Sequence, residues 1–431
     1  MTLTAGAGVD DSYMHIGAAT FLPGPPPAVA DFQALLADMA ARAPVLTYRL
    51  TGTGRHARWE VDPGFDPAHH VDLCEIPRGQ DVHQAVVEIF RDRPLPRDRP
   101  LWNMLILHGH AEDEHVLCYR AHHVFQDGVA LIGTILAFAH GSTVPPPAPG
   151  ASPKVTPVGI TFDVLRDAWK LMRRSHWRPP AGVRAQGRQI HLVRLDLAAY
   201  KEIGHDTGAS RAQISVALVA GAVRALDPAL WLRQSRRTPA EPVVELPINI
   251  RARGDGLLGN QLAMMPVTLP CAEASPLGRL RRVMDEMTPA KLSRRREANR
   301  QLYRTPVPLA HAFISLVSPL VRRLFRGRLV VSVPGRCDEL PGSHGTFVIP
   351  PLLAGSVGSI VITQLGTVML FAGMFDAAMP DADRLMNLIR HELAELRRQA
   401  RQHNETRQPQ EQAQHANEAR NSNSSGEPPL G

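Results

Sequence analysis

Two adjacent histidines, followed four residues later by an aspartate, are the strongest candidates for chemistry in this chain. His122 and His123 end an apolar, strand-like run, and Asp127 and Gly128 precede an apolar, helix-like run. A histidine suits general-base chemistry because its pKa lies near neutral pH, and a nearby carboxylate commonly holds such a histidine in place. The pattern therefore indicates a general base at the end of a strand.

The same residues have two other interpretations. They could be ordinary loop residues around a turn, which is the usual state of an arbitrary pair of histidines. His123 and Asp127 could instead bind a metal ion. However, the spacing offers no third ligand, and adjacent histidines on a strand point to opposite faces. We therefore expect no metal site.

The segment from His122 to Gly128 reads HHVFQDG and resembles the HHxxxDG signature of the CoA-dependent acyltransferase superfamily. That superfamily includes chloramphenicol acetyltransferase-like enzymes and the condensation domains of peptide synthetases. Other segments resemble, in the same order along the chain, motifs of the bacterial wax ester synthase/diacylglycerol acyltransferase family. They are Phe65 to Val71 (FDPAHHV), Pro100-Leu101-Trp102, Leu246 to Arg251 (LPINIR), Leu258-Gly259-Asn260, Val333-Pro334-Gly335 and the stretch from Phe371 to Leu396.

The resemblance implies an O-acyltransferase that moves a fatty acyl group from acyl-CoA to diacylglycerol, to a long-chain alcohol, or to both. Acyl-CoA would be a substrate, and no bound cofactor or metal is implied. The implied fold is α/β, with two chloramphenicol-acetyltransferase-like domains, each a mixed sheet flanked by helices. A tunnel between the domains would suit long apolar substrates, which need a concave and mostly apolar site.

The resemblance also implies a role for each residue of the motif. His123 would be the general base, and Asp127 would hold the loop through an arginine that the sequence leaves unnamed. Gly128 would allow a tight turn into the helix, and His122 would support the loop. Pro100, Leu101 and Trp102 would support the motif, with Trp102 packed in the core.

Two departures from the family pattern keep rival functions open. The family usually has an Asn-Asp pair at the start of the helix expected at 214–226, where this chain has Ala212 and Gln213. Ser332 and Arg336 also replace an Asn and a Pro around the VPG turn. The rivals are an acyltransferase of the same superfamily with another acceptor, and a non-catalytic protein that binds lipid or CoA.

The composition narrows the classes of protein that the chain can be. The 431 residues are 44% hydrophobic and 21% charged, which is globular, and no apolar run approaches the roughly 20 residues of a membrane-spanning helix. The net charge of +7 favours an anionic partner, but aromatic residues are only 5%, so we expect no nucleic-acid binding. The four cysteines are isolated and no secretory signal is visible, so we expect a cytoplasmic protein with reduced thiols.

The length of 431 residues predicts two or three domains, and the resemblance implies two α/β domains. We expect a first domain over 1–143, a proline-rich linker and crossover helix over 144–189, a second domain over 190–402 and a disordered tail over 403–431. The expected helices and strands follow the apolar spacing. The helices are 31–42, 82–91, 128–140, 162–177, 214–226 and 381–399, and the strands are 101–107, 115–121, 190–197, 243–250, 261–269, 329–333, 359–364 and 368–374.

Two basic segments have alternative interpretations. The run Arg294-Arg295-Arg296 is either a solvated helix face or a contact for the phosphates of CoA. The stretch from Pro306 to Arg328 joins an apolar run to four arginines. It could lie at an anionic membrane surface or lipid inclusion, or it could be a packed helix with a basic end. The first of these alternatives predicts peripheral contact with a membrane or lipid inclusion.

Overall fold

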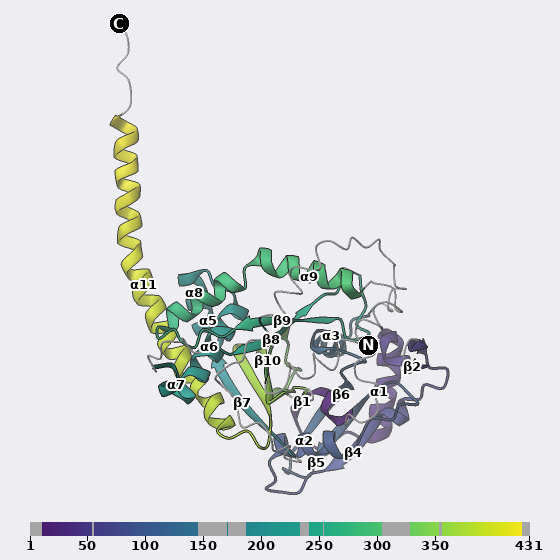
Figure 1. Cartoon of the computed structure of the whole chain (residues 1–431). Coiled ribbons are helices and arrows are strands. Elements are labelled where there is room, and N and C mark those ends of the chain that lie inside the picture. Colours follow the sequence, from purple (N-terminus) through teal and green to yellow (C-terminus); the bar gives the residue numbers. More distant parts are fainter. Residues whose placement is uncertain are drawn as a thin grey trace.

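The computed structural model describes residues 11–53, 56–144, 170, 187–232, 241–252, 254–303, 328–352 and 356–424. In these ranges the chain forms two mixed sheets with helices against them, which confirms the expected α/β class (Figure 1). A short hairpin, β2 (Tyr48–Thr51) and β3 (Arg58–Val61), lies beside the first sheet.

The first sheet has five strands in the order β11-β1-β6-β5-β4, and only the pair β4–β5 is parallel. Its strands are β1 (His15–Pro23), β4 (Val71–Glu75), β5 (Trp102–His108), β6 (Glu114–His122) and β11 (Gly345–Ile349), and its helices are α1 (Val29–Arg42), α2 (Val82–Asp92) and α3 (Gly128–His140). Successive side chains of β1 point to opposite faces. Ala18 shares a cavity wall with Met39 of α1 and Ile135 of α3, whereas Gly17 lies against Phe90 of α2. Helices therefore cover both faces of this sheet.

The second sheet has six strands in the order β7-β13-β12-β10-β8-β9. The central strand β10 is parallel to β8 and β12, and the outer pairs are antiparallel. The strands are β7 (Arg188–Asp196), β8 (Val243–Asn249), β9 (Leu262–Thr268), β10 (Leu329–Cys337), β12 (Gly358–Leu365) and β13 (Val368–Asp376). The helices are α5 (Leu197–Thr207), α6 (Arg211–Leu226), α7 (Pro228–Leu232), α8 (Pro276–Glu286), α9 (Pro289–Tyr303) and α11 (Ala382–Ser424).

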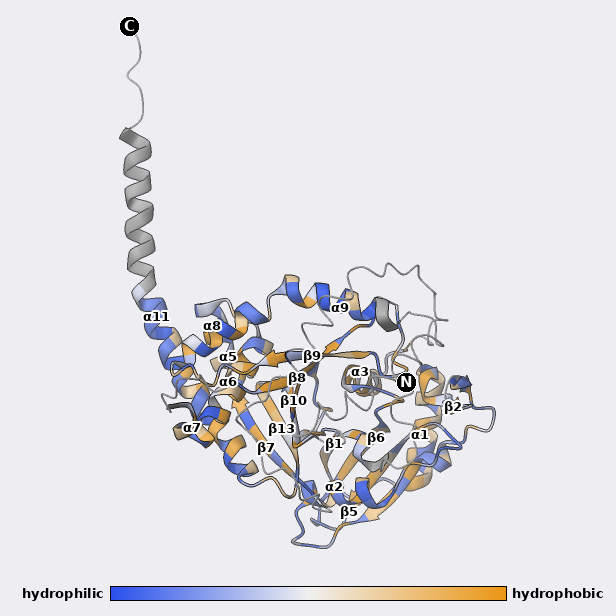
Figure 2. Cartoon of the chain, viewed as in Figure 1, coloured by the Kyte–Doolittle hydropathy of each residue, from blue (hydrophilic) through white to orange (hydrophobic). Residues whose placement is uncertain are grey.

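Each sheet is the apolar centre of its domain, as the orange strands of Figure 2 show. One face of the second sheet packs with α5, α6, α8 and α11 in a single core. The other face contributes Leu370, Ala372 and Met374 of β13 to the core of the first domain. The two domains therefore share buried apolar surface.

The expected domain boundary needs one correction. The range 190–402 was predicted to form only the second domain, but its strand β11 joins the first sheet. β11 pairs antiparallel with β1, with Gly17 opposite Ile349 and Phe21 opposite Gly345. Without β11, the backbone groups along that edge of β1 would be unpaired, which a sheet edge tolerates poorly. The crossing strand ties the two domains together.

The expected disordered tail also needs correction. α11 continues as a helix to Ser424, well past residue 403, and it extends away from both sheets (Figure 1). Of the 22 residues 403–424, 12 are Gln, Glu, Ala or Arg, which are good helix formers, and they outweigh four Asn and Pro409. They also extend a helix that is already anchored by Leu385, Ile389 and Leu396, so there is no nucleation cost.

Most expected elements that lie within the described ranges are present to within a few residues at each end. Strands β1, β4 and β11 and helices α5, α8 and α9 were not predicted. The linker helix at 162–177 and the segment 306–327 lie outside the described residues. Among the helices that are described, none has both the length and the apolarity needed to cross a membrane.

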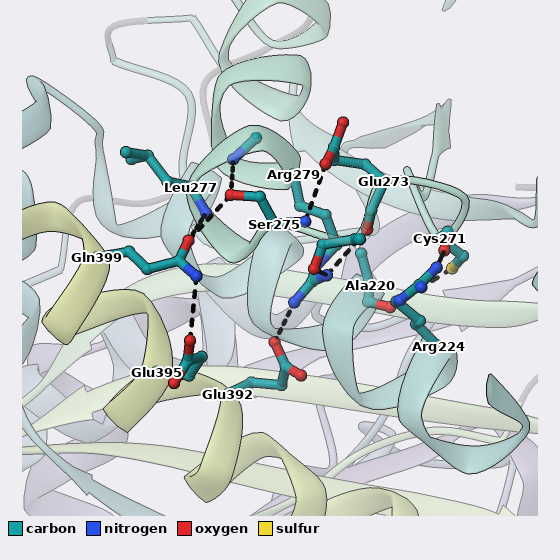
Figure 3. Close-up of polar contacts among 12 residues, drawn as sticks. Ala220, Arg224, Cys271, Glu273, Ser275, Leu277, Arg279, Glu392, Glu395 and Gln399 are labelled. Carbon is teal, nitrogen blue, oxygen red and sulfur yellow. Dashed lines mark hydrogen bonds and ion pairs between the residues drawn. The ribbon is translucent and has the colours of Figure 1, made fainter. Parts of the chain in front are cut away.

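A buried arginine joins helix α8 to helix α11 beside α6 in the second domain (Figure 3). Arg279 of α8 is 2% exposed, and its Nη2 donates to the Glu392 carboxylate of α11. Its Nη1 donates to the carbonyl oxygens of Glu273 and Ala274, both at 2.9 Å. A Cβ at Gly221 of α6 would collide with the Glu392 carboxylate, so the glycine leaves room for the ion pair.

We expect Glu392→Ala to lower the free energy of unfolding by about 3–5 kcal/mol, because it leaves the buried Arg279 guanidinium without its carboxylate. The matched control is Glu395→Ala on the same helix. Glu395 pairs with the exposed Arg398, and a surface pair of this kind contributes about 0–1 kcal/mol. Urea unfolding followed by circular dichroism measures both variants. Equal losses would contradict the importance of the buried pair.

Candidate active site

Asp127 lies at the start of α3 and is completely buried. Its Oδ1 caps the helix by accepting from the amides of Val129 and Ala130, at 3.1 and 3.0 Å. Its Oδ2 accepts from the Arg251 guanidinium and, at 2.8 Å, from the Gln261 amide. The carboxylate thus binds backbone amides and an arginine, and these contacts hold the loop rather than a histidine ring.

Arg251, just beyond the end of β8, is the arginine that sequence analysis left unnamed. Besides Asp127, it donates through Nη2 to the Gly259 carbonyl at 2.7 Å and through Nε to the Gly256 carbonyl at 3.3 Å. The Gly259 amide donates in turn to the Phe125 carbonyl at 2.6 Å. Loop 256–261 of the second domain is therefore fastened to the motif. The signal for this arginine was its place at the end of the LPINIR segment.

His123 lies in the turn between β6 and α3. Its amide donates to the Met14 carbonyl at 2.7 Å, and the residue is half-buried. Its ring Nδ1 is buried and has no hydrogen-bond partner in the described part of the chain. Burial lowers the pKa of His123 below its ordinary value, and the negative charge of Asp127 opposes this only in part. The imidazole is therefore neutral at pH 7, the state that accepts a proton.

His122 is buried, and its contacts shape the turn. Its amide donates to the Leu101 carbonyl at 2.9 Å, and its Nδ1 accepts from the Val124 amide at 3.1 Å. Because Nδ1 accepts this bond, the ring N–H is assigned to Nε2. The ring meets His15 edge-on, with 5.8 Å between centroids. Burial, together with the charge of Arg120, lowers the pKa of His15 to about 3, so His15 is neutral too.

The Pro100-Leu101-Trp102 segment forms one aromatic stack with the Phe65–Val71 segment. The Trp102 indole stacks on the His70 ring, with centroids 4.4 Å apart and planes 21° apart, and Phe65 lies 5.2 Å from His70. The His70 Nδ1–H donates to the Trp102 carbonyl, and the Trp102 Nε1–H donates to the Leu46 carbonyl, both at 2.8 Å. Trp102 is thus a core residue, and its neighbour Leu101 contacts the motif directly.

Gly128 does not occupy the backbone conformation that a glycine-specific turn requires. It is the first residue of α3, and its φ is not positive, so it does not need the left-handed backbone that favours glycine, and its role in a tight turn into the helix stays a prediction. A Cβ there would lie 3.5 Å from the Pro334 side chain, which is ordinary van der Waals contact. The motif and the Val333-Pro334-Gly335 turn of β10 are therefore in contact, although they belong to different domains.

Sequence analysis missed Gln126, one of the variable positions of HHxxxDG. Gln126 is fully buried; the Tyr119 hydroxyl donates to its Oε1, and its Nε2 donates to the Thr134 hydroxyl, both at 2.8 Å. Tyr119 and Thr134 also line an apolar cavity of about 30 Å³ between the first sheet and α1 and α3. A variable motif position offers no sequence signal for this role. The tunnel between the domains stays a prediction.

The departure at Ala212 and Gln213 falls in a helix cap. The Ser210 hydroxyl accepts from the Gln213 amide, and Gln213 Oε1 accepts from the Ser210 amide at 2.7 Å, which is a capping box for α6. Gln213 Nε2 also donates to the Met287 carbonyl at 3.1 Å. These contacts lie within the second domain, and the motif loop does not depend on them.

The described residues contain no group of three His, Cys, Asp or Glu side chains that could hold a metal ion. All four cysteines are free and buried, and burial raises the pKa of each thiol.

Two mixed sheets with an HHxxxDG turn beside their contact define the two-domain class of acyltransferases and condensation domains. The model of the wax ester synthase/diacylglycerol acyltransferase catalytic domain matches residues 3–240, more than half of the chain. The chain therefore belongs to the wax ester synthase/diacylglycerol acyltransferase family.

Curated relatives and a solved structure agree with this membership. Two proteins of Mycobacterium tuberculosis, each named "Putative diacyglycerol O-acyltransferase", are 33% identical over 129 residues (29% of this chain) and 25% identical over 299 residues (60% of it). The chain spans 27% and 59% of their lengths. The wax ester synthase/diacylglycerol acyltransferase of Marinobacter aquaeolei has the same fold, with a TM-score of 0.54 at 18% identity, over 90% of this chain and 95% of that one.

We expect Asp127→Asn to lower the free energy of unfolding by about 3 kcal/mol or more, because it breaks a buried ion pair and leaves Arg251 uncompensated. Asp196→Asn is the matched control, since Asp196 also caps a helix but is exposed, and asparagine caps equally well. Denaturant unfolding and acyl-transfer assays measure both variants. Lost activity with unchanged stability would assign Asp127 to the chemistry instead of the loop.

Proposed function

We propose that this protein is an O-acyltransferase that moves a fatty acyl group from acyl-CoA to diacylglycerol, to a long-chain alcohol, or to both. The observation that carries the proposal is the neutral His123, which stands on a turn locked by Asp127 and Arg251. Family membership supports the reaction class, and the names of the relatives support the acceptor. An acyl-CoA substrate also suits the net charge of +7.

In the proposed reaction His123 acts as the general base and then as the general acid. It takes the proton of the acceptor hydroxyl as the oxygen attacks the thioester carbonyl and a carbon–oxygen bond forms. The tetrahedral intermediate then collapses, the carbon–sulfur bond breaks, and the proton on His123 passes to the departing thiolate of CoA. No acyl-enzyme is needed, so the four buried cysteines take no part.

The rival of a non-catalytic lipid- or CoA-binding protein rested on Ala212 and Gln213. Gln213 serves a helix cap, and the HHxxxDG turn keeps its histidine, aspartate and arginine contacts. An acyltransferase with another acceptor remains the second candidate. The purified protein incubated with radiolabelled palmitoyl-CoA and either hexadecanol or dipalmitoylglycerol tests all three. Label in neither lipid product would contradict the proposed function.

We expect His123→Ala to reduce acyl transfer at least ~10²-fold, because that is the least a lost general base costs. His205→Ala is the matched control, since His205 is exposed and lies in none of the segments that resemble family motifs. The measurement is kcat with palmitoyl-CoA at saturating acceptor, together with thermal unfolding to establish that both variants fold. A His123→Ala variant that keeps more than about a tenth of the wild-type rate would contradict the role of His123 as the general base.

We also propose peripheral contact with an anionic membrane or lipid inclusion through the segment 306–327. The apolar run and the three arginines Arg322, Arg323 and Arg326 support this. Arg328, which sequence analysis grouped with them, is a different case. It is mostly buried and donates to Glu245 of β8 at 3.3 Å. Arg328 therefore belongs to the second sheet and not to the proposed surface.

We expect Arg322, Arg323 and Arg326 changed together to Gln to weaken co-sedimentation with anionic vesicles, since each arginine near such a surface contributes about 1 kcal/mol. A matched control removes the same charge from α11, where Arg384, Arg390 and Arg398 are exposed. Raised salt should weaken binding of the wild type as well. Equal binding of the wild type to neutral and anionic vesicles would exclude an electrostatic membrane contact.

A further inference from the structure

The basic helix α9 has two arginines, one helical turn apart, that point inward and donate to backbone carbonyls, and its neighbouring Arg295 is buried as well. Its run Arg294-Arg295-Arg296 was predicted to be either a solvated helix face or a contact for the phosphates of CoA. α9 lies along β8 and β9 (Figure 1). Arg294 is exposed, whereas Arg296 and Arg300 are half-buried and donate to the backbone at the end of β8. The two inward arginines therefore need a separate explanation.

Arg296 and Arg300 bind three consecutive carbonyl groups. Arg296 Nε donates to the Asn249 carbonyl at 3.0 Å, and Arg300 Nε donates to the Ile250 carbonyl at 2.7 Å. Arg300 Nη2 donates to the carbonyl of Arg251. Since β8 ends at Asn249, the last two carbonyls lie beyond the strand. A guanidinium can serve two adjacent carbonyls because its donors form a rigid planar fork.

The backbone held in this way carries the arginine that holds the catalytic turn. Arg300 binds the backbone carbonyl of Arg251, and the guanidinium of Arg251 donates to Asp127. Arg251 is therefore held at two points, because the Arg300 side chain binds its carbonyl oxygen and Asp127 binds its guanidinium. A continuous series of hydrogen bonds thus runs from α9 to the turn that carries His123.

We propose that Arg300, assisted by Arg296, is a positioning residue for acyl transfer: it fixes the Arg251 backbone so that Arg251 and Asp127 hold His123 in its reactive place. The inference rests on the proposed function of this site. Misplacement of a catalytic group by about 1 Å can cost 10²-fold in rate, so a small shift of Arg251 has a measurable effect. Arg300 acts through Arg251 and touches no substrate.

The first test is steady-state kinetics of Arg300→Gln. We expect kcat to fall about 10-fold with little change in the KM for palmitoyl-CoA, because the general base is displaced while substrate binding is kept. Arg300→Lys should recover part of the loss, since one ammonium can still donate to a carbonyl. Arg294→Gln removes the same charge from the exposed face of α9 and should leave kcat unchanged. A fall for Arg294→Gln equal to that for Arg300→Gln would assign the effect to surface charge and overturn the proposal.

The second test is a double-mutant cycle with Asp127→Asn. If Arg300 acts through Asp127, the double variant should lose no more kcat than Asp127→Asn alone, because both changes break one series of contacts. Losses that multiply would mean that Arg300 acts independently, and they would overturn the proposal. Thermal unfolding of each variant shows whether a general loss of folding explains the kinetics.

The third test does not depend on catalysis, so it separates this inference from the proposed function. Hydrogen–deuterium exchange of Arg300→Gln should rise in the motif turn (122–130) and in loop 256–261, relative to the wild type and to Arg294→Gln. Unchanged exchange in both segments would overturn the positioning role whether or not the wild type transfers acyl groups. If exchange rises in Arg300→Gln but the wild type transfers no acyl group, Arg300 still positions the turn, and the proposed reaction is contradicted.

Discussion

The ion pair between Asp127 and Arg251 is the interaction on which the rest of the site depends. It joins residues 124 positions apart, in the two domains, and both side chains are almost completely excluded from solvent. An isolated buried charge is costly. Here the carboxylate accepts four hydrogen bonds and the guanidinium reaches three acceptors, so each charge is compensated. The pair therefore holds the turn of one domain and the loop of the other in one geometry.

This arrangement gives the aspartate of the motif a role different from that of a carboxylate bonded to a catalytic histidine. The hydrogen bonds of Asp127 go to backbone amides and to Arg251, so it orients the peptide chain around His123. Its charge raises the pKa of His123 less than burial lowers it. The histidine is consequently kept neutral by its surroundings and kept in place by its backbone.

The two domains are held together by a larger constraint as well. β11 leaves the second domain to pair with β1, and β13 contributes its inner face to the core of the first domain. The contact of Gly128 with Pro334 lies close to this shared region. Since the motif stands beside two sheets that share a core and are tied by the crossing strand β11, the position of His123 depends on both domains. A shift of one sheet relative to the other would strain the Asp127–Arg251 pair.

The sequence by itself determined what depends on local pattern: the helix that begins at Gly128, the paired strands β5 and β6, and the HHxxxDG turn between β6 and α3. Strand β1 escaped detection because its small residues, Gly17, Ala18 and Ala19, lack the β-branched character of a typical strand. The tertiary structure alone decided the partner of Asp127, the sheet that β11 joins, and the inward direction of Arg300. Local spacing does not encode pairings across a hundred or more residues, since these depend on the path of the whole chain. The sequence also gives only the position of an arginine, not whether its guanidinium faces water or a backbone carbonyl.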